Sequence, residues 1–186
     1  FPIRVQSMTT TNTNDTEACV RQAEDIIEAG GELVRLTTQG TREAENLKHI
    51  NAQLRADGYQ TPLVADVHFN PNVADVAALY AEKVRINPGN YVDPARKFIV
   101  HEYTDEAYAA ELNKINDRFI PFLNICKANH TAVRIGVNHG SLSDRIRNRY
   151  GDTPAGIVES CMEFLRICKR ESFDNVVISI KSSNTI

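Results

Sequence analysis

Residues 83–90 read Lys-Val-Arg-Ile-Asn-Pro-Gly-Asn, and this short stretch decides the fold class. Its β-branched residues Val84 and Ile86 alternate with two polar residues, which is the period of two that a β-strand produces, and a Pro-Gly pair then ends the strand. Arg85 and Asn87 therefore share one face, and the apolar residues share the other. The stretch predicts a strand whose apolar face packs against helices and whose polar face points away from them.

Five other short segments have the same character, and longer helical stretches separate them. The predicted strands are Ile3–Ser7, Glu32–Thr37, Pro62–Val67, Lys83–Asn87, Ala132–Val137 and Asn175–Lys181. Strands that alternate with helices along a chain are typical of a parallel α/β sheet. A (β/α)8 barrel has eight such units in about 250 residues. We therefore predict an α/β fold of the TIM-barrel type, with six of its eight β/α units present.

An open, doubly wound sheet is the structural alternative, because strand order cannot be deduced from sequence. Such a sheet commonly carries a G-x-G-x-x-G turn after its first strand. Residues 6–10 here read Gln-Ser-Met-Thr-Thr and contain no glycine. This absence favours the barrel.

The helices have recognisable boundaries. The predicted N-caps are Asn14, Asn70, Thr104 and Thr153. Glu17, three residues after Asn14, would complete a capping box. Glycine should end the first helix at Gly30–Gly31 and the second at Gly58. Pro121 should break the fourth helical stretch, which would leave Phe119–Cys126 as a separate short segment.

The phase of residues 83–87 recurs in the other predicted strands and places charged side chains inside the barrel. The predicted interior charges are Arg35, Asp66, His68, Arg85, Arg134 and Lys181. Four cations against one carboxylate leave buried charge unpaired, which costs several kcal/mol. An anionic ligand at the carboxyl ends of the strands would balance this charge, and several arginine forks suit a diphosphate. Asp66 and His68, two residues apart on one face, could form an acid/base or hydrogen-bonding pair.

The remaining charged and thiol groups suggest structural roles. The four cysteines, Cys19, Cys126, Cys161 and Cys168, form no CxxC pair, so we expect buried thiols in a reducing cytoplasm and no metal site. The basic run Arg145–Arg149 resembles a solvated helix face. His139, in a glycine-flanked loop, is a weaker candidate for function. The other histidines, His49, His101 and His130, are expected at the surface.

Composition excludes several classes of protein. The formal net charge of −3 gives no general reason to expect nucleic-acid binding. The longest apolar runs are far too short to cross a bilayer, and no basic start followed by a long apolar stretch suggests a secretory signal. We therefore expect a cytoplasmic protein that contacts neither membrane nor nucleic acid.

Five stretches, in order through nearly the whole chain, resemble the strand motifs of the 4-hydroxy-3-methylbut-2-enyl diphosphate synthases. They are Pro2–Thr9, Leu63–Phe69, Val84–Asn90, Val133–Asn138 and Ser179–Ser183. The long connections at residues 90–103 and 138–152 are similar to the larger form of that family, which carries an extra domain between the barrel and the cluster module.

The resemblance implies an oxidoreductase of the bacterial non-mevalonate route of isoprenoid biosynthesis. It would open 2-C-methyl-D-erythritol 2,4-cyclodiphosphate by two-electron reduction and give 4-hydroxy-3-methylbut-2-enyl diphosphate. The family's motif positions map catalytic groups to Asp66 and His68. They map substrate-binding groups to Arg35, Arg85, Asn87, Arg134, Asn138, Lys181 and Ser183.

The resemblance also implies parts outside this chain. In the family, a C-terminal module holds a 4Fe-4S cluster through three cysteines and a glutamate, caps the barrel of the partner in a homodimer, and receives electrons from ferredoxin or flavodoxin. Residues 1–186 would then be the N-terminal part of the substrate-binding barrel, without the iron–sulfur domain. We expect no cofactor in this portion and no activity from it alone.

Two other functions remain open at the level of sequence. One is a pterin-binding transferase of the dihydropteroate synthase type, which has a related barrel and a diphosphate ligand but no iron. The other is a non-catalytic barrel that binds a phosphate ligand as a subunit of an assembly. A purified parent protein that is brown and contains iron, and that prefers the cyclodiphosphate, would favour the diphosphate synthase over both alternatives.

Overall fold

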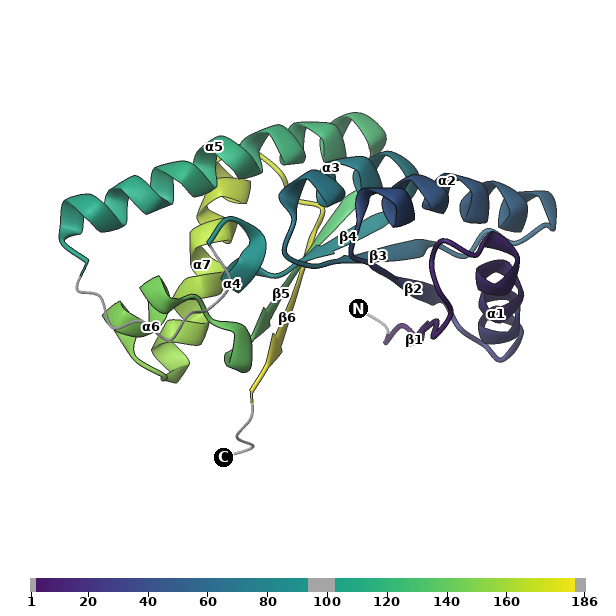
Figure 1. Ribbon diagram of the computed structural model, residues 1–186, viewed down its shortest axis with the longest axis horizontal. Coiled ribbons are helices and arrows are strands. Elements are labelled where there is room, and N and C mark those ends of the chain that lie inside the picture. The colour runs from purple at the N-terminus through teal and green to yellow at the C-terminus, as the bar shows by residue number, and fades with distance from the viewer. Residues whose placement is uncertain (1–2, 94–102, 183–186) are drawn as a thin grey trace.

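The computed structural model describes residues 3–93 and 103–182, and within them six parallel strands form one sheet. The strands are β1 Gln6–Met8, β2 Leu33–Thr38, β3 Leu63–Val67, β4 Lys83–Ile86, β5 Ala132–Asn138 and β6 Val176–Lys181. They pair in chain order, β1-β2-β3-β4-β5-β6, and curl into part of a barrel (Figure 1). A doubly wound sheet reverses its strand order at a switch point. This sheet has no reversal, so the prediction of a TIM-type barrel is confirmed.

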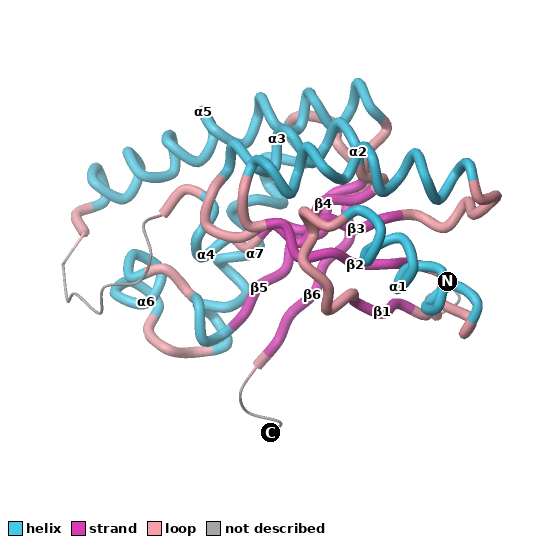
Figure 2. The backbone as a smooth tube through the Cα atoms, turned by 45° about the vertical axis from the view of Figure 1, so that its right-hand side comes forward, coloured by secondary structure: helices cyan, strands magenta, loops and turns pink. Residues whose placement is uncertain are grey.

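Helices follow the strands and cover the outside of the curled sheet. They are α1 Thr16–Glu28, α2 Thr41–Ala56, α3 Pro71–Tyr80, α4 Pro88–Tyr91, α5 Asp105–Asn129, α6 Asp144–Tyr150 and α7 Pro154–Arg170, with the 3-10 helix η1 at His139–Ser141. The α2, α3 and α5 helices pack side by side over one face of the sheet, as both views show (Figures 1 and 2). The opposite, concave face remains available for a site. None of the described helices is both long and apolar enough to cross a membrane.

The core lies between the outer face of the strands and these helices. Apolar residues at alternate strand positions, such as Val34, Leu36, Val84 and Ile135, have no solvent exposure. Full burial of one such side chain contributes about 1.5–3 kcal/mol. The period of two thus fixes which face of each strand packs on helices, and it leaves the polar positions on the concave face.

The last strand is the exception to this burial. Val177, Ile178 and Ile180 on β6 are 41%, 49% and 53% exposed. Among the described residues, β6 pairs in the sheet with β5 alone. The β6 strand therefore lacks the cover that the outer faces of the central strands receive, and its exposure does not follow the predicted alternation, since Ile180, predicted to face outward, lines the concave cavity with Ser179 and Lys181.

Three of the four predicted N-caps are confirmed, and one is wrong. The side chains of Asn70, Thr104 and Thr153 accept the expected backbone hydrogen bonds at the starts of α3, α5 and α7. The first helix is capped by Asp15, whose carboxylate accepts from the backbone N–H of Ala18 at 3.0 Å, and not by Asn14. The reason is that the side chain of Asn12 forms a turn with the backbone of Asn14, which shifts the cap by one residue.

Glycines end the first two helices as predicted. Gly30 and Gly58 have φ angles of 95° and 94°, in the left-handed region where residues with a Cβ are strained.

Pro121 does not break its helix, so the prediction of a separate segment at Phe119–Cys126 is wrong. The α5 helix continues through the proline for 25 residues. A proline inside a helix costs about 3 kcal/mol because one backbone hydrogen bond is lost. Phe119 and Phe122, on either side of it, are fully buried, and Phe119 packs edge-on to Phe164 of α7 with ring centroids 4.9 Å apart. This tertiary packing outweighs the local preference.

The prediction of a solvated face over residues 145–149 is wrong for Arg145, whose side chain is only 3% exposed. Its guanidinium donates to Glu163 of α7 at 2.7 Å and to Asp93 at 3.1 Å, and it lies 4.7 Å from the centre of the Tyr108 ring. Glu163 also accepts from the Tyr108 hydroxyl. Arg145 thus joins α5, α6, α7 and the segment after α4 inside the fold.

Candidate functional site

A polar cavity of about 350 Å³ opens on the concave side of the sheet, toward the carboxyl ends of the strands. Its lining comes from β2, β4, β5, β6 and the residue that follows β3. The lining residues are Arg35, His68, Arg85, Arg134, Val137, Asn138, Ser179, Ile180 and Lys181. Six of the nine predicted site residues are therefore brought together in one cavity, in the region where TIM-type barrels place their active sites.

Asp66 lies beneath this lining and connects three of its residues, two arginines and a histidine. Its carboxylate accepts from Arg35 at 2.6 Å and from Arg85 at 3.0 Å, and it lies 3.2 Å from Nε2 of His68. Burial alone would raise the pKa of Asp66, but the hydrogen bond with His68 and the charges of both arginines outweigh it and lower the pKa to about 2. Asp66 is therefore an ionised anchor at neutral pH.

Arg85 is held across the neighbouring strand β5. Its side chain is 5% exposed, and its second terminal nitrogen donates to the backbone carbonyl of Gly136 at 2.9 Å. A Cβ at Gly136 would lie only 2.4 Å from Nε of Arg85, so this glycine provides the room for the guanidinium. Burial lowers the pKa of Arg85, and Asp66 opposes that shift.

Two other lining cations have no carboxylate partner in residues 3–93 and 103–182. Arg134 donates through Nε to the hydroxyl of Ser179 at 3.0 Å. Burial, followed by repulsion from Arg35, lowers the pKa of Arg134. Lys181 is exposed at the end of β6. Since Arg35 and Arg85 already share Asp66, the cavity carries an excess of positive charge that these described residues do not neutralise.

A further interior cation was missed by the sequence analysis. Lys83 begins β4 in the same phase as Arg85, and burial and the charge of Arg134 lower its pKa. The period of two places Lys83 on the same face as Arg85, so the strand pattern contains the signal that identifies it. It does not line the cavity and adds to the positive potential from below.

The asparagines have different positions. Asn138 lines the cavity, whereas Asn87 is not among the lining residues. The side chain of Asn87 accepts from the backbone N–H of Gly89 and donates to the hydroxyl of Ser141 at 2.8 Å. Asn87 thus ties α4 to η1 and supports the loops around the cavity. The ninth predicted site residue, Ser183, lies outside the described residues.

The histidines outside the cavity differ from one another. His139 pairs with Asp152, which also pairs with Arg147 at 2.8 Å. His139 does not line the cavity, so its functional role stays a prediction. His49 and His130 are exposed, as predicted, and His101 lies outside the described residues.

The cysteines are components of the core and not of the cavity. Cys19 of α1, Cys126 of α5, and Cys161 and Cys168 of α7 are free and buried, and burial raises the pKa of each thiol. In the described ranges, no three His, Cys, Asp or Glu side chains are grouped as metal ligands. These residues therefore do not fit an iron–sulfur cluster.

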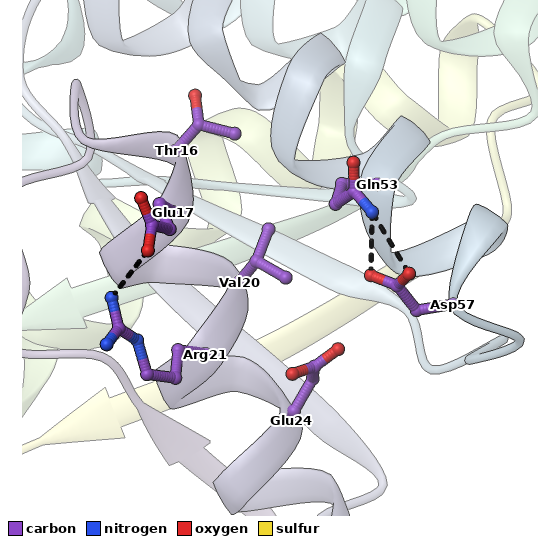
Figure 3. A pocket seen from close by; sticks show the side chains of 7 residues that line it. All are labelled: Thr16, Glu17, Val20, Arg21, Glu24, Gln53 and Asp57. Carbon is purple, nitrogen blue, oxygen red and sulfur yellow. Dashed lines mark hydrogen bonds and ion pairs between the residues drawn. The ribbon is translucent and has the colours of Figure 1, made fainter.

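A second hollow, of about 420 Å³, lies on the outside of the barrel between α1 and α2 (Figure 3). Arg21 pairs with Glu17 at 3.1 Å, and the uncharged amide of Gln53 donates to the carboxylate of Asp57. Glu24 adds a further negative charge. This acidic hollow is unsuited to an anion, in contrast to the cation-lined concave cavity.

The model of the GcpE TIM-barrel domain family matches residues 1–186. The chain belongs to this family. It is 77% identical over 185 residues to the 4-hydroxy-3-methylbut-2-en-1-yl diphosphate synthase (flavodoxin) of Bacteroides fragilis, and 51% identical over 183 residues to the protein of that name from Akkermansia muciniphila. These alignments cover 100% and 98% of this chain but only 30% and 31% of the relatives, so the chain spans about a third of their length. The resemblance found in the strand motifs is thereby confirmed.

More distant solved structures share the fold alone. The 7,8-dihydropteroate synthase of Vibrio fischeri has a TM-score of 0.54 at 12% identity, over 94% of this chain and 60% of that one. The 3-keto-D-glucoside 4-epimerase of E. coli also has a TM-score of 0.54, at 11% identity, over 95% of this chain and 66% of that one.

Proposed function

We propose that this barrel binds 2-C-methyl-D-erythritol 2,4-cyclodiphosphate, and that the complete protein reduces it to 4-hydroxy-3-methylbut-2-enyl diphosphate. The observation that supports this proposal is a cavity lined by three arginines and a lysine, of which only Arg35 and Arg85 pair with a buried carboxylate, Asp66. A cyclic diphosphate supplies the negative charge that this arrangement lacks. The names of the relatives support the same activity.

The roles of the cations follow from their partners. Arg35 and Arg85 are fixed by Asp66, so they present a preorganised positive surface with little freedom left to lose on binding. Arg134 and Lys181, which lack a carboxylate in the described structure, are the groups that we expect to contact phosphate oxygens directly. Asn138 and, by the family resemblance, Ser183 would add neutral hydrogen bonds.

The contact between Asp66 and His68 suits a positioning and proton-handling role at the cavity wall. Because Asp66 is ionised at neutral pH, it cannot itself donate a proton there, and it orients the imidazole of His68. His68 lines the cavity and is the group that we propose moves a proton in the reaction. Asn87, which does not line the cavity, acts through the loop that it holds.

The redox chemistry is proposed to lie outside these residues. We infer a 4Fe-4S cluster, held by another part of the complete protein, as the source of electrons, with flavodoxin as donor in line with the names of the relatives. We further propose a homodimer in the cytoplasm, with residues 1–186 as the N-terminal part of the barrel. The barrel contributes binding, orientation and charge neutralisation.

Calorimetric titration of the complete protein tests the substrate assignment. We expect the cyclodiphosphate to bind more tightly than a pterin diphosphate. Lys181→Met should weaken that binding by about 1.5–3 kcal/mol, the range for a hydrogen bond to a charged group. Lys114→Met, which removes an exposed lysine on α5, is the matched control and should bind as the wild type does. Preference for the pterin, or an unchanged affinity of the Lys181 variant, would contradict the proposal.

A further inference from the structure

The three guanidinium groups of the cavity are not equivalent. Arg35 and Arg85 each form an ion pair with Asp66, which fixes their direction. Arg134 forms no ion pair with any residue in 3–93 or 103–182, although its side chain is half-buried. A flexible arginine without a partner samples many rotamers, so the direction of Arg134 depends on whatever weaker contact it makes.

That contact is a single hydrogen bond to a neutral group. Nε of Arg134 lies 3.0 Å from the hydroxyl oxygen of Ser179. A guanidinium can only donate, so the serine oxygen accepts. Because the bond occupies Nε, an anion cannot approach Arg134 side-on through that nitrogen. The two terminal nitrogens remain available and form the end-on fork that matches two oxygens of one phosphate group.

The sheet register explains why Ser179 can do this. Arg134 is paired in register with Val177, and Ser179 lies two residues further toward the carboxyl end of β6. The hydrogen bond therefore draws the arginine along the strand toward the mouth of the cavity. Ser179 itself is opposite Gly136, whose missing side chain leaves space beside the hydroxyl that Arg85 partly fills.

We propose that Ser179 is a positioning residue for anion binding: it orients Arg134 so that both terminal nitrogens face the same phosphate group in the cavity. This inference rests on the proposed function only in taking the ligand to be a phosphate compound. Ser179 acts through Arg134, and its hydroxyl is not required to touch the ligand. A threonine at this position keeps the acceptor, whereas an alanine loses it.

The test is a double-mutant cycle with inorganic pyrophosphate as the probe, measured by calorimetry on the complete protein. Ser179→Ala should weaken binding about fivefold, as expected for the loss of one neutral hydrogen bond that orients a charged donor. Ser179→Thr should bind within about twofold of the wild type. In an Arg134→Ala background, Ser179→Ala should have no further effect, because the residue through which it acts is gone.

Ser7→Ala is the matched control, since Ser7 is an exposed serine on β1, paired in register with the outward-facing Val34. It should leave binding unchanged. Thermal unfolding of each variant separates a folding defect from a binding defect. Unchanged binding by Ser179→Ala would overturn the inference. An equal loss with and without Arg134 would also overturn it.

The same measurements distinguish this inference from the proposed function. If pyrophosphate binding shows the coupling but the cyclodiphosphate does not bind, the proposed substrate is wrong and the role of Ser179 stands. If the cyclodiphosphate binds and Ser179→Ala changes neither affinity, the role of Ser179 is wrong and the proposed function stands. Failure of the wild type to bind either anion would overturn both.

Discussion

At the scale of single residues, Asp66 organises the cavity because one carboxylate contacts two arginines and a histidine. Its oxygens contact Arg35, Arg85 and His68, and its side chain is 4% exposed. Removal of one partner from a buried ion pair leaves an uncompensated charge, which commonly costs about 3–5 kcal/mol. Asp66, the carboxylate that holds the two arginines of the cavity, is thus also a residue on which the stability of the barrel depends.

This linkage predicts a pH dependence of stability. The pKa of Asp66 in the folded protein, about 2, lies below its ordinary value of 3.8. The carboxylate therefore contributes stability that is fully present above about pH 5 and is lost as the pH falls toward 2, about 2 kcal/mol in all. Asp66→Asn lacks this contribution. The wild type should be more stable than the variant at pH 7, and the difference in urea-unfolding free energy should shrink as the pH falls from 5 to 2.

Asp57→Asn is the control for this experiment, because Asp57 is an exposed carboxylate at the end of α2. Its stability should follow that of the wild type throughout the pH range. A difference between the Asp66 variant and the wild type that does not change with pH would mean that ionisation of this carboxylate does not stabilise the fold.

At the scale of secondary-structure elements, local sequence rules predicted the strands better than the helices. The alternation of apolar and polar residues placed β3 and β4 within one residue, because each apolar face must meet the helices. The first strand was predicted at Ile3–Ser7 but pairs only at Gln6–Met8, since pairing requires a partner strand and not only a pattern. The predictions for Pro121 and Arg145 were wrong for a related reason: the residues that pack around them are distant in sequence and leave no local signal.

The candidate site was also only partly predictable from the sequence. Strand phase indicated which residues face the interior, and six of the nine predicted residues line the cavity. Phase could not indicate that two arginines share Asp66 while Arg134 relies on Ser179, because side-chain directions depend on register and rotamer. It also could not show that Asn87 is absent from the cavity lining and instead holds a loop through Ser141.

The buried contacts of Arg145 with Asp93 and Glu163 lead to a prediction about the α6 helix. Arg145→Met would leave Asp93 and Glu163 buried next to each other without a cation, so we expect a loss of about 3–5 kcal/mol in unfolding free energy. The opposing charges, together with hydrogen bonds that outweigh the effect of burial, raise the pKa of Arg145, so the wild-type group stays charged at any usable pH. Urea unfolding of the complete protein, followed by a signal from the barrel domain, measures this loss of unfolding free energy.

Arg147→Met is the matched control two residues further along α6. Arg147 is a partly exposed arginine that pairs with the surface carboxylate Asp152, so its loss should cost less than about 1 kcal/mol. Adding Glu163→Gln to Arg145→Met should recover part of the stability, since it removes one of the two stranded charges. Equal effects at positions 145 and 147 would contradict a buried role for Arg145.

At the scale of the whole molecule, the net charge of the chain and the charge of the cavity have opposite signs. The chain as a whole carries a formal charge of −3. The concave cavity concentrates Arg35, Arg85, Arg134 and Lys181, whereas acidic groups such as Glu17, Glu24 and Asp57 line the outer hollow between α1 and α2. The curled sheet therefore separates a positive interior from a more acidic exterior. An approaching anion meets opposite influences from the local and the overall charge.

Salt distinguishes these two influences by sign. If the local cavity charge governs binding, screening weakens the attraction, and the dissociation constant for pyrophosphate should rise on the order of fivefold between 50 and 500 mM sodium chloride. If the overall negative charge governed, screening would weaken a repulsion and binding would tighten. Lys181→Met should show a smaller salt effect than the wild type, because Lys181 is exposed and fully screened whereas Arg85 is buried. Calorimetry at several salt concentrations measures both slopes, and tighter binding at high salt would mean that the cavity does not act as a site of concentrated positive charge.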